Sequence, residues 1–213
     1  MKKIMFSDEF MLTKAVLEGR KTQTRRVITY PKTFHGEDVC GYYVCRRATD
    51  RAITEVCMYD ENESFIDEGQ ILPKYKVGEV VAVAQSMCDV YAEWDMTYLG
   101  KDTKALMDKF GGSPCFNNKM FVRASEMPHQ IRITDVRVER LQDISDDDCL
   151  KEGVRKVVNE NGIYIQYYVG QGNNACSFEN PQEAFAHLIN KVSRKDVWQE
   201  NPYVFVYDFE IVK

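Results

Sequence analysis

The segment 203–211, YVFVYDFEI, is the clearest strand in the sequence. Large apolar side chains occupy every second position of it: Tyr203, Phe205, Tyr207, Phe209 and Ile211. Successive side chains of a β-strand point to opposite faces of the sheet, so these five share one face. The pattern predicts a strand that packs one face against the core.

The segment 130–140, QIRITDVRVER, predicts a second and longer strand. Its apolar residues change parity along the way: Ile131, Ile133, Val136 and Val138. A change of parity requires an extra residue, so we expect a bulge or bend near 134–135, as found where a sheet curls. The run EVVAVA at 79–84 is continuously apolar and predicts a third, buried strand.

Capping residues predict three modest helices. The first is expected to begin after Ser7 and end at Gly19, and the second to begin after Ser145 and end at Gly153. The third begins at Asn180 and carries an apolar stripe that we assign to the core: Phe185, Leu188, Ile189 and Val192. Several strands with irregular connections and few helices favour an α+β fold, with a small mixed β-barrel, over a parallel βαβ sheet.

The composition indicates one soluble globular domain spanning 1–213, since 44% of the 213 residues are hydrophobic and no low-complexity linker divides them. Seven cysteines form an odd set without a CxxC pair, which is typical of reduced thiols. No apolar run approaches the roughly 20 residues of a membrane span, and Asp8 and Glu9 interrupt the start. We therefore expect a cytoplasmic protein with no membrane partner.

The charge is distributed unevenly along the chain. The whole sequence has 28 basic and 33 acidic residues and a net charge of -5. Residues 1–26 carry seven basic and three acidic side chains, or +4, which leaves -9 on residues 27–213. This balance disfavours a general nucleic-acid coat protein or long, non-specific phosphate binding, and it favours a local basic site for a small or short anionic ligand.

The segment GRKTQTRR at 19–26 places four cations and two threonines directly behind a helix end. One interpretation is a solvated connection whose basic residues offset the helix dipole. A second is an anion or nucleobase site, because guanidinium groups offer planar donor forks. A third is nucleophilic: Lys21 and Thr24 are three residues apart, and a neutral lysine can take the proton of a threonine hydroxyl.

This segment resembles a known family. Gly19, Lys21, Thr24 and Arg25 resemble the GxKxxTxR signature of ASCH domains, which share the β-barrel of the PUA-like superfamily. Three more segments resemble ASCH strands in the same order: 77–86, 127–145 and 201–211. The phrase RVERLQDIS is similar to the longer ASCH proteins of bacterial genomes and their prophages. About half of the chain is covered, and 30–75, 88–118 and 154–179 are expected to be insertions on the barrel.

The resemblance implies two functions. Many ASCH domains are thought to bind RNA, a nucleotide or a modified nucleoside in a cleft beside this loop, without a cofactor. One compact branch hydrolyses the acetyl amide of N-acetylcytidine with a Thr-Lys-Glu arrangement, in which Thr24 would be the nucleophile and Lys21 the base. The expected glutamate is replaced, because the seventh position after Gly78 is Gln85, and the neighbouring Arg and Trp positions hold Ala84 and Ala82.

A glutamine cannot hold negative charge or accept a proton as a base, so this departure favours a binding module over an enzyme. Gln85 could still hydrogen-bond the edge of a base. The residues expected to line the ligand cleft are Arg20, Lys21, Thr24, Arg25, Arg26, Gln85, Arg123 and His129, with Lys21 and Thr24 as the catalytic candidates.

The sequence bears on two further possibilities, a metal site and an interaction protein. No metal site is expected, because the three histidines are far apart and the one cluster of possible ligands, His35 with Cys40, Cys45 and Cys57, lacks the tight pairs of tetrahedral sites. A phage-derived interaction protein is the remaining alternative, with the three insertions as its partner surface.

Overall fold

The computed structural model describes residues 1–91, 112–159, 165–171 and 175–212. Its largest sheet has five strands in the order β1-β8-β9-β13-β2. The strands are β1 Lys3–Ile4, β2 Gln23–Val27, β8 Val80–Val83, β9 Gln130–Arg140 and β13 Tyr203–Ile211. β13 lies between β9 and β2 and pairs antiparallel with both, while β1 pairs parallel with β8. The three predicted strands are therefore confirmed, and the two longest form the middle of the sheet.

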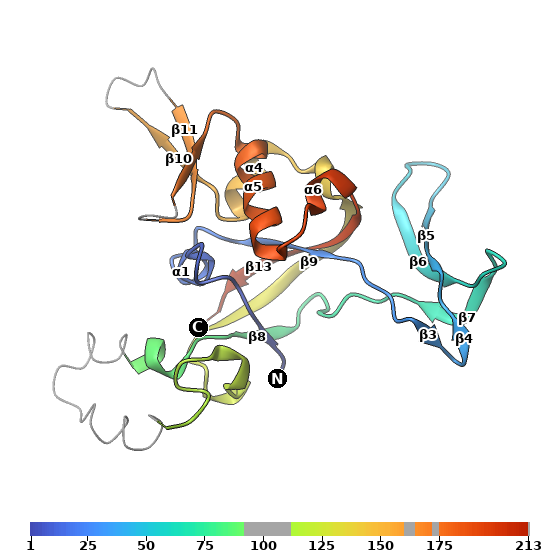
Figure 1. The fold of residues 1–213 in the computed structure, drawn as a ribbon, viewed down its shortest axis with the longest axis horizontal. Helices are drawn as coiled ribbons and strands as arrows, with labels where there is room; N and C mark the ends of the chain where they lie inside the picture. The colour runs from blue at the N-terminus through green and yellow to red at the C-terminus, as the bar shows by residue number, and fades with distance from the viewer. Residues whose placement is uncertain (92–111, 160–164, 172–174, 213) are drawn as a thin grey trace.

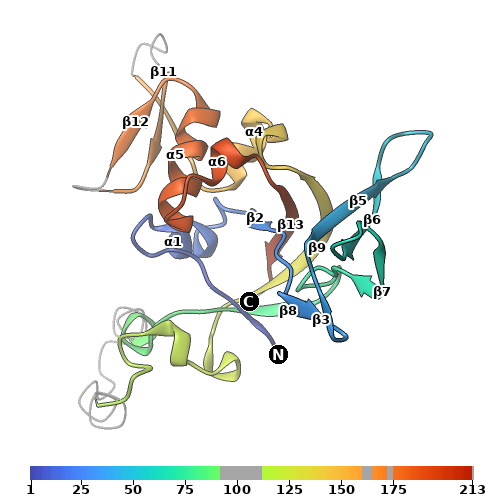
Figure 2. The same ribbon diagram turned by 45° about the vertical axis from the view of Figure 1, so that its right-hand side comes forward.

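The bulge expected in β9 is confirmed. Asp208 of β13 pairs with Asp135, whereas the next residue, Phe209, pairs with Ile133, so Thr134 is the extra residue. On one side of the bulge Ile131 and Ile133 are completely buried. A bulge increases the local twist of a strand, and Figure 2 shows β9 and β13 curving together around the core.

The sheet is curled and open rather than a closed barrel. β1 and β2 are its two edges, and no backbone pairing joins them within the part of the chain that the structure describes. A side chain bridges this seam instead, because the guanidinium of Arg26 donates to the carbonyl oxygen of Met5 over 2.7 Å. The fold is thus α+β and mostly strands, as expected, but the predicted barrel closure is replaced by one polar contact.

The α-helices with both ends in the described residues are α1 Leu12–Leu17, α4 Asp146–Lys151, α5 Pro181–Ser193 and α6 Val197–Glu200, and residues 87–91 are also helical. Three short 3-10 helices accompany them: η1 Lys119–Phe121, η2 Ala124–Glu126 and η3 Leu141–Asp143. The caps of α4 and α5 are confirmed, since the Ser145 hydroxyl accepts from the amide of Asp148 and the Asn180 side chain accepts from that of Gln182. No helix in the described ranges is long and apolar enough to cross a membrane.

The predicted start of the first helix is wrong. The helix begins at Leu12, after Met11 in the left-handed conformation at φ 57°, rather than directly after Ser7. The intervening turn is held by the amide of Leu12, which donates to the carbonyl of Ser7 over 2.8 Å. The carboxylate of Asp8 accepts from the hydroxyl of Thr13 over 2.5 Å, so this side-chain contact stabilises the turn.

The three expected insertions differ in content. Residues 30–75 contain β3 Thr33–Phe34, β4 Glu37–Asp38 and a three-stranded sheet of β5 Gly41–Arg46, β6 Ile53–Tyr59 and β7 Phe65–Gln70. Its hairpin is the predicted one, and Figure 1 shows it projecting on the right. Residues 154–179 contain β10 Arg155–Val158, β11 Ile165–Val169 and β12 Cys176–Phe178. Most of 88–118 lies outside the described residues, since 92–111 are not among them.

One large apolar cluster fills the concave side of the central sheet. Its fully buried members include Tyr207 of β13, Ile131 and Ile133 of β9, and Phe185 of α5. The stripe predicted on α5 is only partly core, because Phe185 and Leu188 are buried whereas Val192 is exposed. The core thus joins α5 to the sheet beside β2, the strand that carries Thr24, Arg25 and Arg26.

Gly153, directly after α4, is a position that only glycine suits. Its φ is +109°, and a Cβ there would lie 2.9 Å from Cδ2 of Leu12. We expect Gly153→Ala to lower the free energy of unfolding by about 2–4 kcal/mol, from backbone strain plus overpacking. Gly78→Ala is the control, because its φ is +82° in open space, so strain alone should cost about 1–2 kcal/mol. Equal losses in urea titrations would contradict the close packing of Gly153 on α1.

Candidate functional site

Lys21, the first of the two catalytic candidates, is buried in the protein interior at 2% exposure. Its ammonium donates to Oε2 of Glu152 over 2.6 Å, to the carbonyl of Glu152 over 2.7 Å and to the carbonyl of Gln23 over 2.8 Å. Burial lowers the pKa of Lys21 below that of a solvated lysine, and Glu152 opposes this shift. All three ammonium donors are therefore used inside the protein.

Arg25 is also held internally, with a side chain that solvent does not reach. One terminal nitrogen donates to the side-chain oxygen of Gln23 and to Glu152 over 3.2 Å. The other donates to Glu139 over 2.5 Å and to Asp148 over 3.3 Å. The guanidinium expected to bind a ligand is thus neutralised by three carboxylates of the chain itself.

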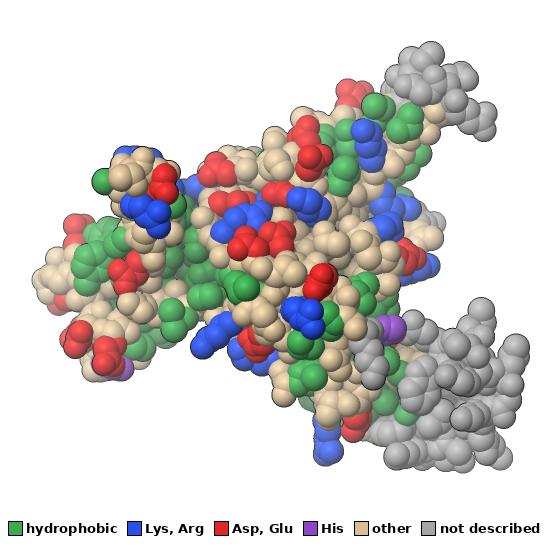
Figure 3. Space-filling model, turned by 180° about the vertical axis from the view of Figure 1, so that it is seen from behind, with side chains coloured by type: hydrophobic (Ala, Val, Ile, Leu, Met, Phe, Trp, Pro, Cys, Tyr) green, Lys and Arg blue, Asp and Glu red, His purple; other side chains and the backbone are tan. Residues whose placement is uncertain are grey.

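We call this set the charge network: Lys21, Arg25, Arg137, Glu139, Asp148, Glu152 and Asp208. Arg137 joins it from β9 through ion pairs to Glu139, Asp148 and Asp208. Burial by itself would raise the pKa of Asp148. The positive charges of Lys151, Arg25 and Arg137 have the larger effect and hold the pKa of Asp148 below its usual range. Figure 3 shows basic and acidic side chains interleaved on the middle of one face of the molecule.

A cavity of about 230 Å³ lies beside the charge network, and we call it the helix pocket. The segment 5–7, β2 and α5 form its walls, and Glu152 reaches it from the end of α4. Thr24, the second catalytic candidate, lines it at 5% exposure, and its hydroxyl hydrogen-bonds no residue that the structure describes. Nε of Arg25, which also lines it, is buried without an acceptor in the same part of the chain. Apolar side chains of α5 and of the segment 5–7 form most of the pocket surface, and a few polar groups are available to a ligand.

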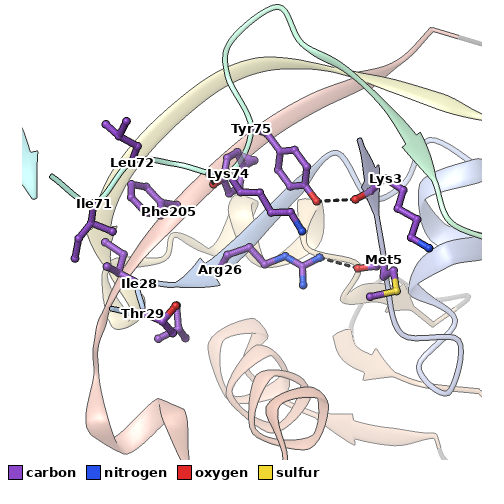
Figure 4. Close-up of a pocket in the computed structure, with 12 residues that line it drawn as sticks. Lys3, Met5, Arg26, Ile28, Thr29, Ile71, Leu72, Lys74, Tyr75 and Phe205 are labelled. Carbon is purple, nitrogen blue, oxygen red and sulfur yellow. Dashed lines mark hydrogen bonds between the residues drawn. The ribbon is translucent and has the colours of Figure 1, made fainter. Parts of the chain in front are cut away.

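Arg26 differs from the other cations of its segment because no carboxylate among the described residues pairs with it. Its guanidinium donates to the carbonyl of Met5 and lies 5.9 Å from the ring centroid of Phe6. It lines the helix pocket and also a second cavity of about 290 Å³. Figure 4 shows this second cavity, which we call the edge pocket because it lies at the seam between β1 and β2.

The remaining predicted site residues lie elsewhere. Arg20 is exposed and pairs with Glu18 over 2.6 Å. Gln85 is buried after β8, where its backbone N–H donates to the sulfur of Met127 over 3.3 Å. It lines neither pocket. Arg123 and His129 lie before β9 and line neither pocket. In the sheet order β9 and β13 lie between β2 and β8, the strand that precedes Gln85.

Two site features were missed by the sequence reasoning. One is Glu152, the buried carboxylate that pairs with Lys21 over 2.6 Å. A signal existed, because an acid at the C-terminal end of a helix is unfavourable towards the helix dipole and so indicates a specific partner. The other is the segment 71–75, whose Lys74 and Tyr75 line the edge pocket and carry no recognisable motif.

No group of three His, Cys, Asp or Glu side chains within the described ranges is placed to hold a metal ion. The thiols of all seven cysteines are free, including Cys40, Cys45 and Cys57. Burial raises the pKa of the Cys149 thiol to about 12, which keeps this thiol protonated. The chemistry of the site therefore depends on the charge network, Thr24 and Arg26.

The charge network should make Glu152 a determinant of stability. Glu152→Gln leaves Lys21 and Arg25 buried with less compensating charge, and we expect the free energy of unfolding in urea to fall by about 3–5 kcal/mol. Glu18→Gln is the matched control, because Glu18 pairs with Arg20 and Lys14 on the surface and should change stability by less than about 1 kcal/mol. A similar small effect of both substitutions would show that the network contributes little.

Comparison with known proteins found no relative of this chain. No protein-family model matches it, and neither does any curated protein or solved structure. A proposal for its function therefore depends on its own residues and on the ASCH resemblance of its motifs.

Proposed function

We propose that this chain is an ASCH-type binding module with a PUA-like fold, which binds a nucleoside, free or modified, or as part of a nucleotide or RNA. The observation that carries the proposal is the helix pocket beside the GRKTQTRR segment, where Thr24, Arg25 and Arg26 meet an apolar wall. The curled five-stranded sheet and the order of the four resembling segments support the fold. Free thiols on all seven cysteines support a cytoplasmic location.

The size and lining of the helix pocket suit one planar, uncharged group. Pockets for drug-sized ligands measure about 300–1,000 Å³, whereas this one measures about 230 Å³. Small-molecule sites combine apolar walls with a few placed polar groups. Phe185 and Leu188 supply the apolar wall, while the hydroxyl of Thr24 and the guanidinium of Arg26 supply polar contacts. A nucleobase has both the flat apolar faces and the polar edge that this arrangement would recognise.

The charge network gives Lys21 and Arg25 a positioning role in this proposal. All three donors of Lys21 and both terminal nitrogens of Arg25 bind internal acceptors, so these residues hold β2 and the end of α4 together below the pocket. Arg26 is the next residue along β2, and its direction is fixed by the backbone that Arg25 anchors. Ligand contact therefore falls to Thr24 and Arg26.

Binding of nucleosides tests this proposal. We expect calorimetric titration with the four ribonucleosides and N-acetylcytidine to detect binding of at least one of them by the wild-type chain. Arg26→Ala should weaken it about tenfold or more and Thr24→Val several-fold, in line with lost charged and neutral hydrogen bonds. Thr24→Val should unfold at a urea concentration close to the wild-type value, and Arg26→Ala, which also loses its hydrogen bond to Met5, should lose about 1–2 kcal/mol of stability and remain folded in the titration.

Arg20→Ala is the matched control, because it removes the same group from the same segment outside the helix pocket. It should leave nucleoside affinity unchanged. Absence of binding to all five nucleosides, or equal losses in the Arg20 and Arg26 variants, would overturn the proposal.

The ion pair of Lys21 with Glu152 favours a second candidate, an amidohydrolase acting on N-acetylcytidine-like substrates. The carboxylate lacking at Gln85 is supplied by Glu152, at 2.6 Å from the lysine ammonium, and Thr24 lines the same pocket. In this reaction the lysine passes a proton to Glu152 and then takes the proton of Thr24 as its oxygen attacks the acetyl carbon. The amino group of the cytosine ring leaves with a proton from the Lys21 ammonium, and water then hydrolyses the threonine ester to release acetate.

Acetate release from N-acetylcytidine tests the second candidate. We expect Thr24→Ser to retain turnover, because it keeps the hydroxyl, and Thr24→Ala to lose it by about a hundredfold or more. Binding of N-acetylcytidine without acetate release by the wild-type chain would exclude hydrolysis and leave the binding proposal intact.

A further inference from the structure

We infer that the edge pocket is the phosphate subsite of the same ligand, so that the chain prefers a phosphorylated nucleoside to a free one. This inference rests on the proposed nucleoside site in the helix pocket. The two pockets adjoin, since Met5, Arg26 and Val27 line both of them. A base in the helix pocket would therefore direct its sugar and phosphate across Arg26 into the edge pocket.

The charge of the edge pocket supports an anionic occupant. Lys3, Arg26 and Lys74 are among the described residues that line it, and none of those residues is acidic. The ammonium of Lys3 is used elsewhere, because it donates to the carbonyls of Met120 over 2.6 Å and Val122 over 2.9 Å. Arg26 and Lys74 remain as two cations without a carboxylate partner in the described chain, in a protein whose net charge is -5.

The two cations present complementary donors. Among the described residues, the Arg26 guanidinium uses one nitrogen, in the hydrogen bond to Met5. The rest of its planar fork suits two oxygens of a phosphate, and the Lys74 ammonium adds a point charge. Figure 4 shows the ends of the Lys74 and Arg26 side chains in the same part of the pocket, with the ring of Tyr75 beside them. This geometry favours a compact anion with several oxygens.

The backbone that carries Lys74 is fixed before any ligand binds. Its amide donates to the hydroxyl of Tyr207 over 3.0 Å, and its carbonyl accepts from the ammonium of Lys2 over 2.6 Å. The next residue, Tyr75, donates its hydroxyl to the carbonyl of Lys3 over 2.9 Å and packs edge-on against Tyr207. Because the backbone is already held, only the exposed Lys74 side chain has to become ordered when the anion binds, which limits the conformational entropy lost.

The experiment compares each nucleoside with its 5'-monophosphate and with a trinucleotide RNA of the same base. The wild-type chain should bind a phosphorylated form at least about tenfold more tightly than the nucleoside, as charged hydrogen bonds imply. Lys74→Ala should remove most of that gain and leave nucleoside affinity unchanged. Lys76→Ala is the matched control, because it removes an exposed lysine two residues away that lines neither pocket.

The outcomes separate this inference from the proposed function. A gain with the monophosphate indicates a free nucleotide, and a gain with the trinucleotide alone indicates the phosphodiester of a strand; both support the subsite. Nucleoside binding without any gain from phosphate overturns the subsite and leaves the proposed function standing. Equal losses in the Lys74 and Lys76 variants also overturn it, and failure of every ligand to bind overturns both proposals.

Discussion

The buried pairing of Lys21 and Arg25 with Glu152 is the constraint on which the rest of the structure depends. A charge removed from water without a partner is strongly destabilising, so each member must meet its counter-ion when the chain folds. Asp148 comes from α4 and Glu152 directly follows that helix, while Asp208 comes from β13. Glu139 and Arg137 come from β9, and Lys21 and Arg25 come from β2 and the segment before it. The network therefore fixes how α4 lies against the middle of the sheet.

This constraint changes what the basic segment 19–26 can do. Its cations suggest an open anion site when they are counted along the sequence, but two of them are neutralised inside the protein and Arg20 pairs with Glu18. Arg26 is left at the seam between β1 and β2, where it joins the two edges and borders both pockets. A ligand is thus offered one guanidinium in a defined place rather than a basic patch.

Local patterns predicted the elements whose causes are local. Alternation in 203–211 and the parity change near Thr134 correspond to β13 and to the bulge in β9, and Ser145 and Asn180 cap the helices that follow them. The start of α1 was predicted wrongly, because Asp8 accepts from Thr13 and the chain makes a turn before Leu12. The hydrogen bond between Asp8 and Thr13 stabilises this turn in place of a helix capped by Ser7, and a capping preference for single residues does not include such a contact.

The sequence by itself determined the class of fold, three of the five strands of the central sheet (β8, β9 and β13) and the position of the segment that carries Thr24 and Arg26, but not that this segment forms the strand β2. Only the tertiary structure decided which groups meet there. It brought Glu152 to Lys21 from 131 residues away and left Gln85 outside both pockets. Within the described residues it left β1 and β2 without backbone pairing, and Arg26 donates across that seam to Met5. Alternation and capping act over a few residues, whereas pairing of buried charges is decided by the order of strands in space.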